Sequence, residues 1–311
     1  MSKIDNSKQI ASVGIMVLMM LLSVVVEAQE EYAYAVRGND TLKMDVYLPV
    51  SSREDSSCII YLHGGAFRSG AKRHPFDSNY CALLASRGFV AVSVEYRQLF
   101  AGLTTDSLNL CNLIPTFDTV LQAAVEDCAA AIAYVAEQAE RWSISKRHLY
   151  LVGSSAGAIT ILQTDYCRAN GIGWASMIPA DLNLAGIISY SGAVFSRQGK
   201  VRYQQLPTPT CLFHGTRDRI VPYKGISFFR NRFEGSRRLV RKLKKADANY
   251  LIYRIEDLAH DVCEFGPMTI EELEYFIAMT QSGRHFQYDT ESYGVQPLPI
   301  LEYYKPIWRL N

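Results

Sequence analysis

Residues 148–162 read HLYLVGSSAGAITIL, and this stretch decides the fold. An apolar strand-like run ends at the pentapeptide Gly-Ser-Ser-Ala-Gly of residues 153–157, and an amphipathic helix-like run follows directly. A strand-to-helix turn this sharp has no room for side chains beside its middle residue, and the two glycines meet that demand. The middle residue, Ser155, is therefore the predicted nucleophile in preference to Ser154. The alternative is an ordinary glycine and serine turn at the start of a helix.

A second glycine-rich turn lies upstream, where residues 63–67 read HGGAF directly after the apolar run CIIYL. A carbonyl attacked by a hydroxyl becomes an oxyanion, which needs preorganised N–H donors on a backbone that can come close to it. We predict donors at Gly65 and Ala66, joined by the N–H of Ala156 just after the nucleophile. His63 is expected to brace this loop rather than to transfer protons. A plain glycine turn is the alternative here.

Two further motifs supply an acid and a base. Asp218 ends the motif HGTRD after the strand-like run CLF, and His260 lies in LAHD after the run YLIYRI. An acid that accepts a hydrogen bond from a histidine fixes the tautomer of its imidazole. The chain order Ser155, Asp218, His260 is the order expected of an α/β-hydrolase. Three other acids near His260 are alternatives to Asp218, and the first two would have to fold back to reach it: Glu256, Asp257 and Asp261.

Strand and helix patterns alternate through the rest of the chain. Alternating apolar and polar residues predict an early strand with one solvent-exposed face at 42–48. Short apolar runs, which suit parallel strands covered on both faces, predict further strands at 58–62, 89–94, 149–152, 185–189, 210–213 and 250–255. Helices are expected at 79–87, 119–141, 155–169, 224–245 and 268–281. We interpret the basic run 230–245 as the solvated face of a helix, because apolar residues are interleaved with its cations.

This alternation predicts the fold class α/β. We expect one domain with the α/β-hydrolase fold, a mostly parallel doubly wound sheet flanked by helices. Each of the motifs above lies beyond the C-terminal end of a predicted strand, where open α/β sheets bind their ligands. Four unrelated turns are not expected to share that position, so the placement of the motifs is the strongest argument for a single site.

The N-terminus resembles an export signal. Lys3 and Lys8 precede an apolar run that is too short to cross a hydrocarbon core of ~30 Å as a helix. The run ends in Val-Glu-Ala, which has the small residues of a cleavage site, so we expect a signal peptide over 1–28 that is cleaved after Ala28. The catalytic domain would then span 29–283, with a C-terminal extension over 284–311 packed on or beside it.

The protein is thus expected to be exported, either periplasmic or secreted. An uncleaved membrane anchor is the alternative reading of the N-terminus. No later stretch is expected to span a membrane, so we predict no stable membrane insertion after cleavage. The 32 Lys and Arg against 31 Asp and Glu give a formal net charge of +1, which provides no reason to expect a nucleic acid partner.

Seven cysteines match no zinc-binding spacing, and we predict no metal and no cofactor. Four of them lie in strand-like or helix-like runs, where buried inert thiols are expected: Cys58, Cys128, Cys167 and Cys211. A disulfide that involves a loop cysteine such as Cys111 stays open, as does the oligomeric state.

The motifs HGGAF, VEYR (94–97), GSSAG and HGTRDRIVP (214–222), with the Ala259-His260 pair, resemble exported bacterial carboxylesterases. This family includes relatives of hormone-sensitive lipase, acetyl-xylan esterases and feruloyl esterases, and the resemblance covers roughly 42–281. The opening LKMDVYLP is also similar to that group, as is the part of the helix 119–141 that starts at Asp127, before the nucleophile strand. This chain departs from the family at Ala66, Phe67, Ala158 and Ala259, where the family often has glycine, or tryptophan in the oxyanion loop.

These observations predict a serine carboxylic ester hydrolase that works through an acyl-enzyme. Its partner would be a small-molecule or carbohydrate ester, with acetyl or feruloyl groups as the expected acyl part. The aromatic side chains that could line an acyl pocket, if they do not simply fill the core, are Phe67, Phe100, Phe117, Trp174 and Phe195. Two alternatives are a serine peptidase of the prolyl-oligopeptidase type and a non-catalytic binding protein on a hydrolase scaffold.

Overall fold

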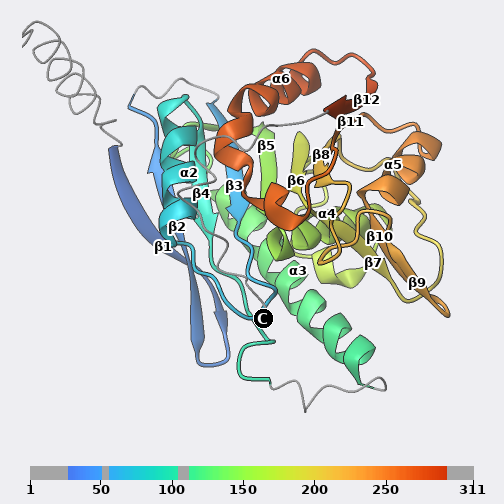
Figure 1. The fold of residues 1–311 in the computed structure, drawn as a ribbon. Coiled ribbons are helices and arrows are strands. Elements are labelled where there is room, and N and C mark those ends of the chain that lie inside the picture. Colours follow the sequence, from blue (N-terminus) through green and yellow to red (C-terminus); the bar gives the residue numbers. More distant parts are fainter. Residues whose placement is uncertain (1–26, 51–55, 104–111, 293–311) are drawn as a thin grey trace, which may run out of the picture.

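A computed structural model describes residues 27–50, 56–103 and 112–292 of the chain. Nine of the described strands form one sheet in the order β1-β2-β4-β3-β5-β6-β8-β11-β12 (Figure 1). Strands β1 and β2 form an antiparallel hairpin, β2 pairs antiparallel with β4, and all later pairs are parallel. The strands are β1 (Glu27–Arg37), β2 (Asp40–Leu48), β3 (Ser56–Leu62), β4 (Val90–Val94), β5 (Ile144–Ser154), β6 (Gly186–Tyr190), β8 (Thr210–Gly215), β11 (Tyr250–Ile255) and β12 (Gln287–Ser292).

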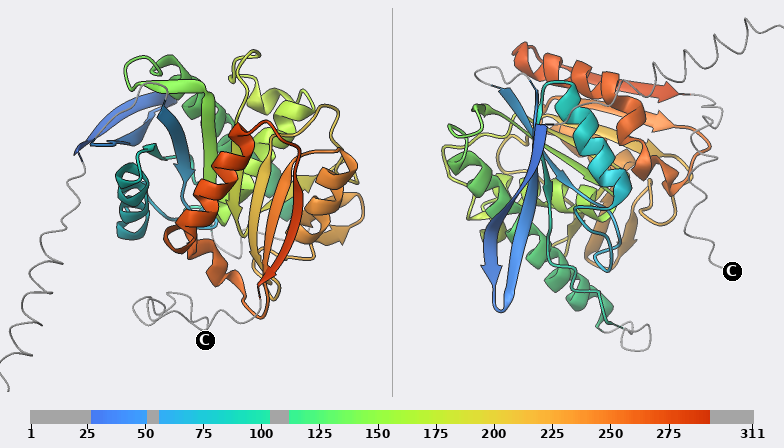
Figure 2. Two further views of the ribbon diagram at one scale, coloured as in Figure 1. Left: turned by 90° about the horizontal axis from the view of Figure 1, so that it is seen from above. Right: turned by 90° about the vertical axis from the view of Figure 1, so that its left-hand side faces the viewer.

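Helices cover both faces of this sheet, because successive strand residues point to opposite sides. Ile59 and Tyr61 pack under α2 (Pro75–Ser86) and α6 (Ile270–Gln281), which lie together on one side in the left-hand view of Figure 2. Ile60 and Leu62 pack on the other side under α3 (Leu113–Glu137), α4 (Ala156–Ala169) and α5 (Ser236–Lys245). The predicted doubly wound α/β-hydrolase fold in a single domain is therefore confirmed.

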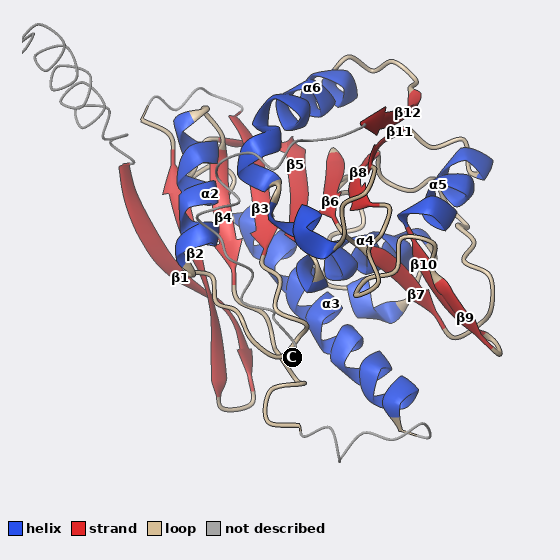
Figure 3. Ribbon diagram, in the orientation of Figure 1, coloured by secondary structure: helices blue, strands red, loops and turns tan. Residues whose placement is uncertain are grey.

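The helix expected over 224–245 is wrong in its first half. Residues 226–235 form a hairpin of β9 (Ile226–Phe228) and β10 (Asn231–Gly235), which pairs with β7 (Ala193–Ser196) in a small second sheet (Figure 3). Gly235 closes the hairpin against the chain before it, since a Cβ there would lie 2.0 Å from the carbonyl oxygen of Pro222. The backbone of Gly235 is extended, with φ −69° and ψ 170°, so α5 begins only at Ser236.

The edges of the sheet were not predicted either. Strand β1 precedes the first predicted strand, and β12 adds a parallel strand beside β11 from within the proposed C-terminal extension. The predicted signal peptide lies almost wholly outside the described residues, as does the end of the extension, and both remain predictions. Within residues 27–50, 56–103 and 112–292, the 3₁₀ helices are η2 (Gly173–Ala175), η3 (His260–Glu264) and η4 (Gly266–Thr269).

Helix α3 is long and apolar enough, by length and composition, to cross a membrane. This corrects the expectation that no later stretch has those properties. Most of the apolar part of α3 is buried inside the fold, where it packs against the sheet and α4. Its apolar character is therefore explained as that of a core helix.

Six cysteines are free, and Cys111 lies outside the described residues.

A buried ion-pair triad ties α3 to the sheet. The fully buried carboxylate of Asp127 accepts hydrogen bonds from Arg97 after β4, at 2.8 Å, and from Arg37 at the end of β1, at 2.9 Å. The backbone N–H of Arg97 adds a third bond to the same carboxylate at 3.0 Å. The arginine of the VEYR motif and the aspartate of the following helix are thus partners, so each neutralises a charge that burial would otherwise disfavour.

Candidate active site

Ser155 lies at the turn between β5 and α4 in a strained backbone conformation, with φ 48° and ψ −111°. The neighbouring glycines allow this turn, because a Cβ on Gly153 would lie 2.6 Å from the carbonyl carbon of Gly157, and one on Gly157 would lie 2.0 Å from the carbonyl oxygen of Leu62. The backbone N–H of Ser155 bonds the carbonyl of Tyr190 on β6. These contacts hold the strained turn in place and so fix the hydroxyl above the carboxyl end of the sheet.

The three predicted triad residues meet at this end of the sheet. The Oγ of Ser155 lies 2.8 Å from Nε2 of His260, and Nδ1 of His260 lies 2.7 Å from Oδ2 of Asp218. They come from the ends of three strands, β5, β11 and β8, and from positions up to 105 residues apart in the chain. This geometry lets the imidazole accept the serine proton while its other nitrogen stays bonded to the carboxylate.

The carboxylate of Asp218 is held in its ionised form. Burial alone would raise its pKa, but hydrogen bonds from His214 and His260 outweigh burial and hold the pKa well below its ordinary value. The other oxygen, Oδ1, accepts the backbone N–H groups of Ile220 at 2.9 Å and Val221 at 3.0 Å. Both oxygens are therefore engaged, and the carboxylate has a single orientation toward the imidazole.

The alternative acids point elsewhere. Glu256 accepts a hydrogen bond from Thr216, exposed Asp257 pairs with Arg217, and Asp261 is exposed. The structure thus brings Asp218, and none of these three, to His260.

Ser154, the residue before the predicted nucleophile, has a different partner. Its hydroxyl donates to the carbonyl of Cys263 at 2.7 Å. This bond ties the turn before Ser155 to η3, the short helix that begins with His260.

A second imidazole contacts the acid, and sequence reasoning missed it. His214 is fully buried, and its Nε2 lies 2.9 Å from the carbonyl oxygen of Val221 and 3.3 Å from Oδ2 of Asp218. Because a carbonyl can only accept, Nε2 carries the proton, and Nδ1 accepts from the hydroxyl of Ser236 at 2.7 Å. The signal was present in the sequence, since His214 opens the motif that ends in Asp218.

The loop that follows β3 has the backbone expected of an oxyanion hole. Gly65 has φ 116°, and Ala66 and Phe67 have φ near 55°. A Cβ on Gly64 would lie 3.4 Å from Cβ of Ser155, so the loop passes directly beside the serine. Among the described residues, the N–H groups of Gly65 and Ala66 have no hydrogen-bond acceptor. The N–H of Ala156 is at the first position of α4, where no earlier turn of helix can accept it.

His63 lies under this loop and not at the site. Its Nδ1 is 2.6 Å from the carbonyl oxygen of Gly64, and its ring stacks on Tyr96 with centroids 4.8 Å apart. Burial lowers the pKa of His63 to about 4, so the ring is neutral near pH 7. A Cβ on Gly70 would lie 2.5 Å from Nδ1, so the loop folds tightly around the ring. These contacts support the predicted bracing role.

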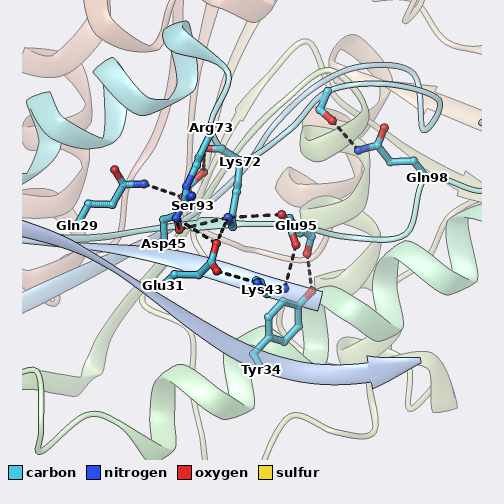
Figure 4. Close-up of polar contacts among 11 residues, drawn as sticks. Gln29, Glu31, Tyr34, Lys43, Asp45, Lys72, Arg73, Ser93, Glu95 and Gln98 are labelled. Atoms are coloured by element: carbon cyan, nitrogen blue, oxygen red, sulfur yellow. Dashed lines mark hydrogen bonds and ion pairs between the residues drawn. The ribbon is translucent and has the colours of Figure 1, made fainter. Parts of the chain in front are cut away.

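A buried ion-pair cluster fixes the far end of the same loop (Figure 4). The almost fully buried Nζ of Lys72 lies 2.8 Å from Glu31 on β1, 3.2 Å from Asp45 on β2 and 3.5 Å from Glu95 after β4. Arg73 adds two bonds to the buried carboxylate of Asp45, at 2.8 and 2.9 Å. Hydrogen bonds from Lys43 and Lys72 lower the pKa of Glu31 to about 2. The cluster thus anchors the loop to the first strands of the sheet.

Aromatic side chains gather beside the oxyanion loop around Phe117 of α3. Its ring contacts those of Phe67 and Phe195 edge to face, at centroid distances of 6.0 and 5.2 Å, and stacks on Phe100 at 6.3 Å. Phe233 of β10 completes the group at 6.1 Å. Four of the five predicted pocket residues therefore form one cluster, while the fifth, Trp174 of η2, packs against the same apolar core without a ring contact to them among the described residues.

A surface hollow is lined by residues that follow β8, by the end of β11 and by the start of α5. Neither Ser155 nor His260 lines it, and its walls are Thr216, Tyr223, Lys224, Arg237, Arg254 and Glu256. Within the described ranges, no group of three or more His, Cys, Asp or Glu side chains is placed to hold a metal ion.

Comparison with known proteins agrees with this arrangement. Residues 44–163 match the model of the BD-FAE family, a family of α/β-hydrolase esterases, and this segment includes the oxyanion loop and Ser155. The chain is also similar to Gut esterase 1 of Caenorhabditis elegans, with 26% identity over 127 residues. That match covers 40% of this chain and 21% of the nematode protein, so the chain matches only about a fifth of the length of this relative.

Solved structures extend the likeness to most of the chain. A thermophilic esterase from the Planctomycetes species Thermogutta terrifontis superposes with a TM-score of 0.58 at 20% identity, over 81% of this chain and 92% of that one. The same esterase phosphoramylated by tabun gives a TM-score of 0.57 at 20% identity, over 83% and 94% of the two chains. Its butyrate-bound form gives 0.57 at 19% identity, over 83% and 93%. This chain therefore has the α/β-hydrolase fold found in carboxylesterases.

Proposed function

We propose that this α/β-hydrolase is a serine carboxylesterase that acts through an acyl-enzyme on short-chain or carbohydrate-linked acyl esters. The observation that carries the proposal is the unbroken hydrogen-bonded series from Ser155 through His260 to Asp218. The match to an esterase family over 44–163 supports an ester, rather than a peptide, as the bond that is cleaved.

The mechanism follows from the partners of each side chain. His260 removes the proton of Ser155, whose oxygen forms a bond to the ester carbonyl carbon as the carbonyl π electrons move to oxygen. The N–H groups of Gly65, Ala66 and Ala156 would bind that oxyanion, and the ionised Asp218 would stabilise the imidazolium. His260 then gives its proton to the leaving alcohol. Water, activated by the same imidazole, releases the acid and restores the serine.

The aromatic cluster around Phe117 supports an apolar acyl group. Phe67 joins this cluster directly to the oxyanion loop, so an acyl chain on the serine would point toward aromatic side chains. Acetyl and feruloyl groups both fit that surrounding by chemistry, since one is small and apolar and the other carries an aromatic ring. We therefore propose that the acyl part of the ester determines which substrates the enzyme accepts.

A panel of substrates tests the proposal. Nitrophenyl acetate, nitrophenyl butyrate, methyl ferulate and acetylated xylan would be compared with an aminoacyl anilide, for the wild-type protein and for Ser155→Ala. We expect ester hydrolysis in the wild type, its loss by at least about a thousandfold in the variant, and no anilide cleavage. A fluorophosphonate should label the wild type and not the variant.

Ser154→Ala is the matched control, because it removes a neighbouring hydroxyl that bonds a carbonyl and not the imidazole. This variant should retain labelling at Ser155. Anilide cleavage that exceeds ester cleavage would support a peptidase instead, and a protein that neither hydrolyses esters nor reacts with the fluorophosphonate would be a binding protein.

The export signal is a separate proposal. Cleavage after Ala28 would remove only the first two residues of β1, and Gln29 would keep its 2.8 Å bond to Asp45. The fold would therefore survive processing. Mass measurement of the protein recovered from the culture medium or periplasm should give an N-terminus at Gln29, and a chain that retains residues 1–28 in the membrane fraction would contradict export.

A further inference from the structure

The hairpin of β9 and β10 exposes three apolar side chains at its tip. Phe229 is 84% exposed, Phe228 is 54% exposed and Ile226 is 53% exposed. The hairpin extends away from the main sheet at the right-hand edge of the molecule in Figure 1. Single exposed apolar residues are ordinary, but a contiguous group on a projecting element marks a surface that contacts an apolar phase.

The surroundings of this tip are strongly basic. The segment 217–245 contains 11 of the 32 Lys and Arg residues of the chain, and its two acids, Asp218 and Glu234, are both buried. The rest of the chain therefore holds 32 − 11 = 21 cations against 31 − 2 = 29 anions. This segment thus has a net charge of +9, against −8 for the rest of the chain. The exposed acids next to it are Asp247, which follows α5, and Asp257, which pairs with Arg217.

Helix α5 brings these cations next to the hairpin. Its buried face consists of Ser236, Leu239, Val240 and Leu243, so every other side chain of the helix is an Arg or Lys. Arg238 bonds the hydroxyl of Ser227 on β9 at 2.7 Å, which fixes the helix beside the hairpin. Lys224 and Arg237, which line the hollow described above, extend the positive surface.

We propose that the tip of Ile226, Phe228 and Phe229, with the cationic face of α5, docks the protein reversibly on an anionic lipid surface. Aromatic side chains at the tip would enter the boundary between head groups and acyl chains, and the cations would face the lipid phosphates. The combination of a small apolar wedge and a basic surround fits peripheral attachment and not insertion across the bilayer.

The geometry of the two phenylalanines favours lipid over a polysaccharide. Their ring planes meet at 82° with centroids 4.7 Å apart. Sugar rings stack on flat aromatic surfaces, and two perpendicular rings do not form one. A wedge that enters disordered acyl chains has no such requirement, so the perpendicular pair suits a bilayer.

Flotation with lipid vesicles tests this docking. Residues 29–311, the form expected after signal cleavage, would be mixed with vesicles of phosphatidylcholine alone or of phosphatidylcholine with an equal part of phosphatidylglycerol. We expect binding to the anionic vesicles at about 0.05 M salt and its loss at about 0.5 M, because salt screens exposed charges. Phe228→Ser with Phe229→Ser should weaken the partition coefficient by at least about tenfold.

Charge variants distinguish binding through this surface from nonspecific electrostatic attraction between protein and vesicle. Lys244→Gln with Lys245→Gln should weaken partition by about 25-fold, at about fivefold per cation. Lys146→Gln with Arg147→Gln removes two exposed cations near the start of β5, at the end away from Ser155, and should leave vesicle partition unchanged. Leu206→Ser removes an exposed apolar residue outside the hairpin and should also leave vesicle partition unchanged. Ser155→Ala should bind like the wild type, so this result is independent of the proposed hydrolysis.

Several results would overturn the docking surface. They are no flotation at low salt, equal binding of the Phe228→Ser, Phe229→Ser variant, or equal binding to neutral vesicles. Retention on glucuronoxylan without vesicle binding would assign the surface to an anionic polysaccharide and equally refute a lipid partner. Thermal unfolding of each variant would be measured in parallel. An unchanged melting temperature would show that a loss of binding comes from the substituted side chains and not from unfolding.

Discussion

The buried imidazole of His214 donates from Nε2 toward Oδ2 of Asp218 at 3.3 Å, the same oxygen that His260 contacts at 2.7 Å. The carboxylate therefore lies between two histidines, of which only one reaches the serine. We assign His214 as a positioning residue, because the carbonyl of Val221 fixes its tautomer and its second nitrogen is bound by Ser236.

His214→Ala should lower kcat about tenfold with little change in KM, because Asp218 would lose one of the groups that orient it. Loss of a donor to Oδ2 also leaves a more basic carboxylate. The acid limb of the kcat/KM profile should therefore move to higher pH, as His260 becomes easier to protonate. His214→Gln, which can present an N–H at a similar position, should recover part of the activity. A purely structural role would change the melting temperature without moving the pH profile.

The oxyanion loop should not tolerate a side chain at Gly65. Its φ is 116°, and an added Cβ would lie 1.8 Å from the carbonyl oxygen of Ser69, so Gly65→Ala must displace the loop. We expect kcat to fall by about 10²- to 10³-fold, the usual cost of a lost oxyanion donor.

The matched control is Gly88→Ala, which has a similar positive φ of 94° and no atom within 4 Å of the added Cβ. It should cost about 1 to 2 kcal/mol of stability and leave kcat unchanged. Wild-type activity in Gly65→Ala would remove this loop from the proposed site.

The ion-pair cluster should make Lys72 far more important than its neighbour Lys43. Lys72→Met would remove the buried cation that contacts Asp45, Glu31 and Glu95, while the half-exposed Arg73 would still pair with Asp45 and Glu31. We expect a loss of about 2 kcal/mol in the free energy of unfolding. Lys43 is 45% exposed and pairs with Glu31 alone, so Lys43→Met should cost less than about 1 kcal/mol. Urea unfolding of both variants measures the difference, and equal losses would contradict the proposed anchor.

Asp77 should make the protein less stable as pH rises from about 4 to 6. Burial raises the pKa of this carboxyl to about 6, although the hydroxyl of Tyr61 donates to it at 2.5 Å. In this window the folded state binds more protons than the unfolded chain, so unfolding becomes easier as the pH increases. A difference of about two pKa units corresponds to roughly 3 kcal/mol.

Asp77→Asn keeps an acceptor for Tyr61 and cannot ionise. The variant should be more stable than the wild type at pH 7 and should lose less stability between pH 4 and 6, where burial also raises the pKa values of Asp165 and Glu264. The exposed Asp181→Asn serves as the control and should follow the wild type. Asp218 acts with the opposite sign and at lower pH: its depressed pKa stabilises the fold above about pH 4, and this contribution is lost on further acidification. Urea titrations at several pH values would distinguish the two effects.

The core of the fold and the triad could be predicted from the sequence for a common reason. Buried parallel strands give continuous apolar runs, and the residues that follow them must gather at one edge of the sheet. Ser155, Asp218 and His260 each follow such a run directly or within a few residues. The three residues lie close together because the strands before them end at the same edge of the sheet, and the positions of those strands can be predicted from the sequence.

Features that depend on contacts between distant segments could not be read in this way. The hairpin at 226–235 was predicted as helix because its cations and apolar residues have helical spacing, and the close approach of Gly235 to Pro222 is a tertiary contact. The partners of Lys72 come from three separate segments, and β12 is short, exposed and weakly apolar. None of these leaves a local pattern.

The parallel pairing of β8 with β11 aligns Gly215 with Ile255. Asp218 follows Gly215 by three residues and His260 follows Ile255 by five. The register of the two strands therefore sets where the loops that carry the acid and the base begin. A register shift of one residue would displace one loop by about 3.3 Å and would move every side chain of its strand to the other face of the sheet. The distance between carboxylate and imidazole is thus set during assembly of the sheet, well before any substrate arrives.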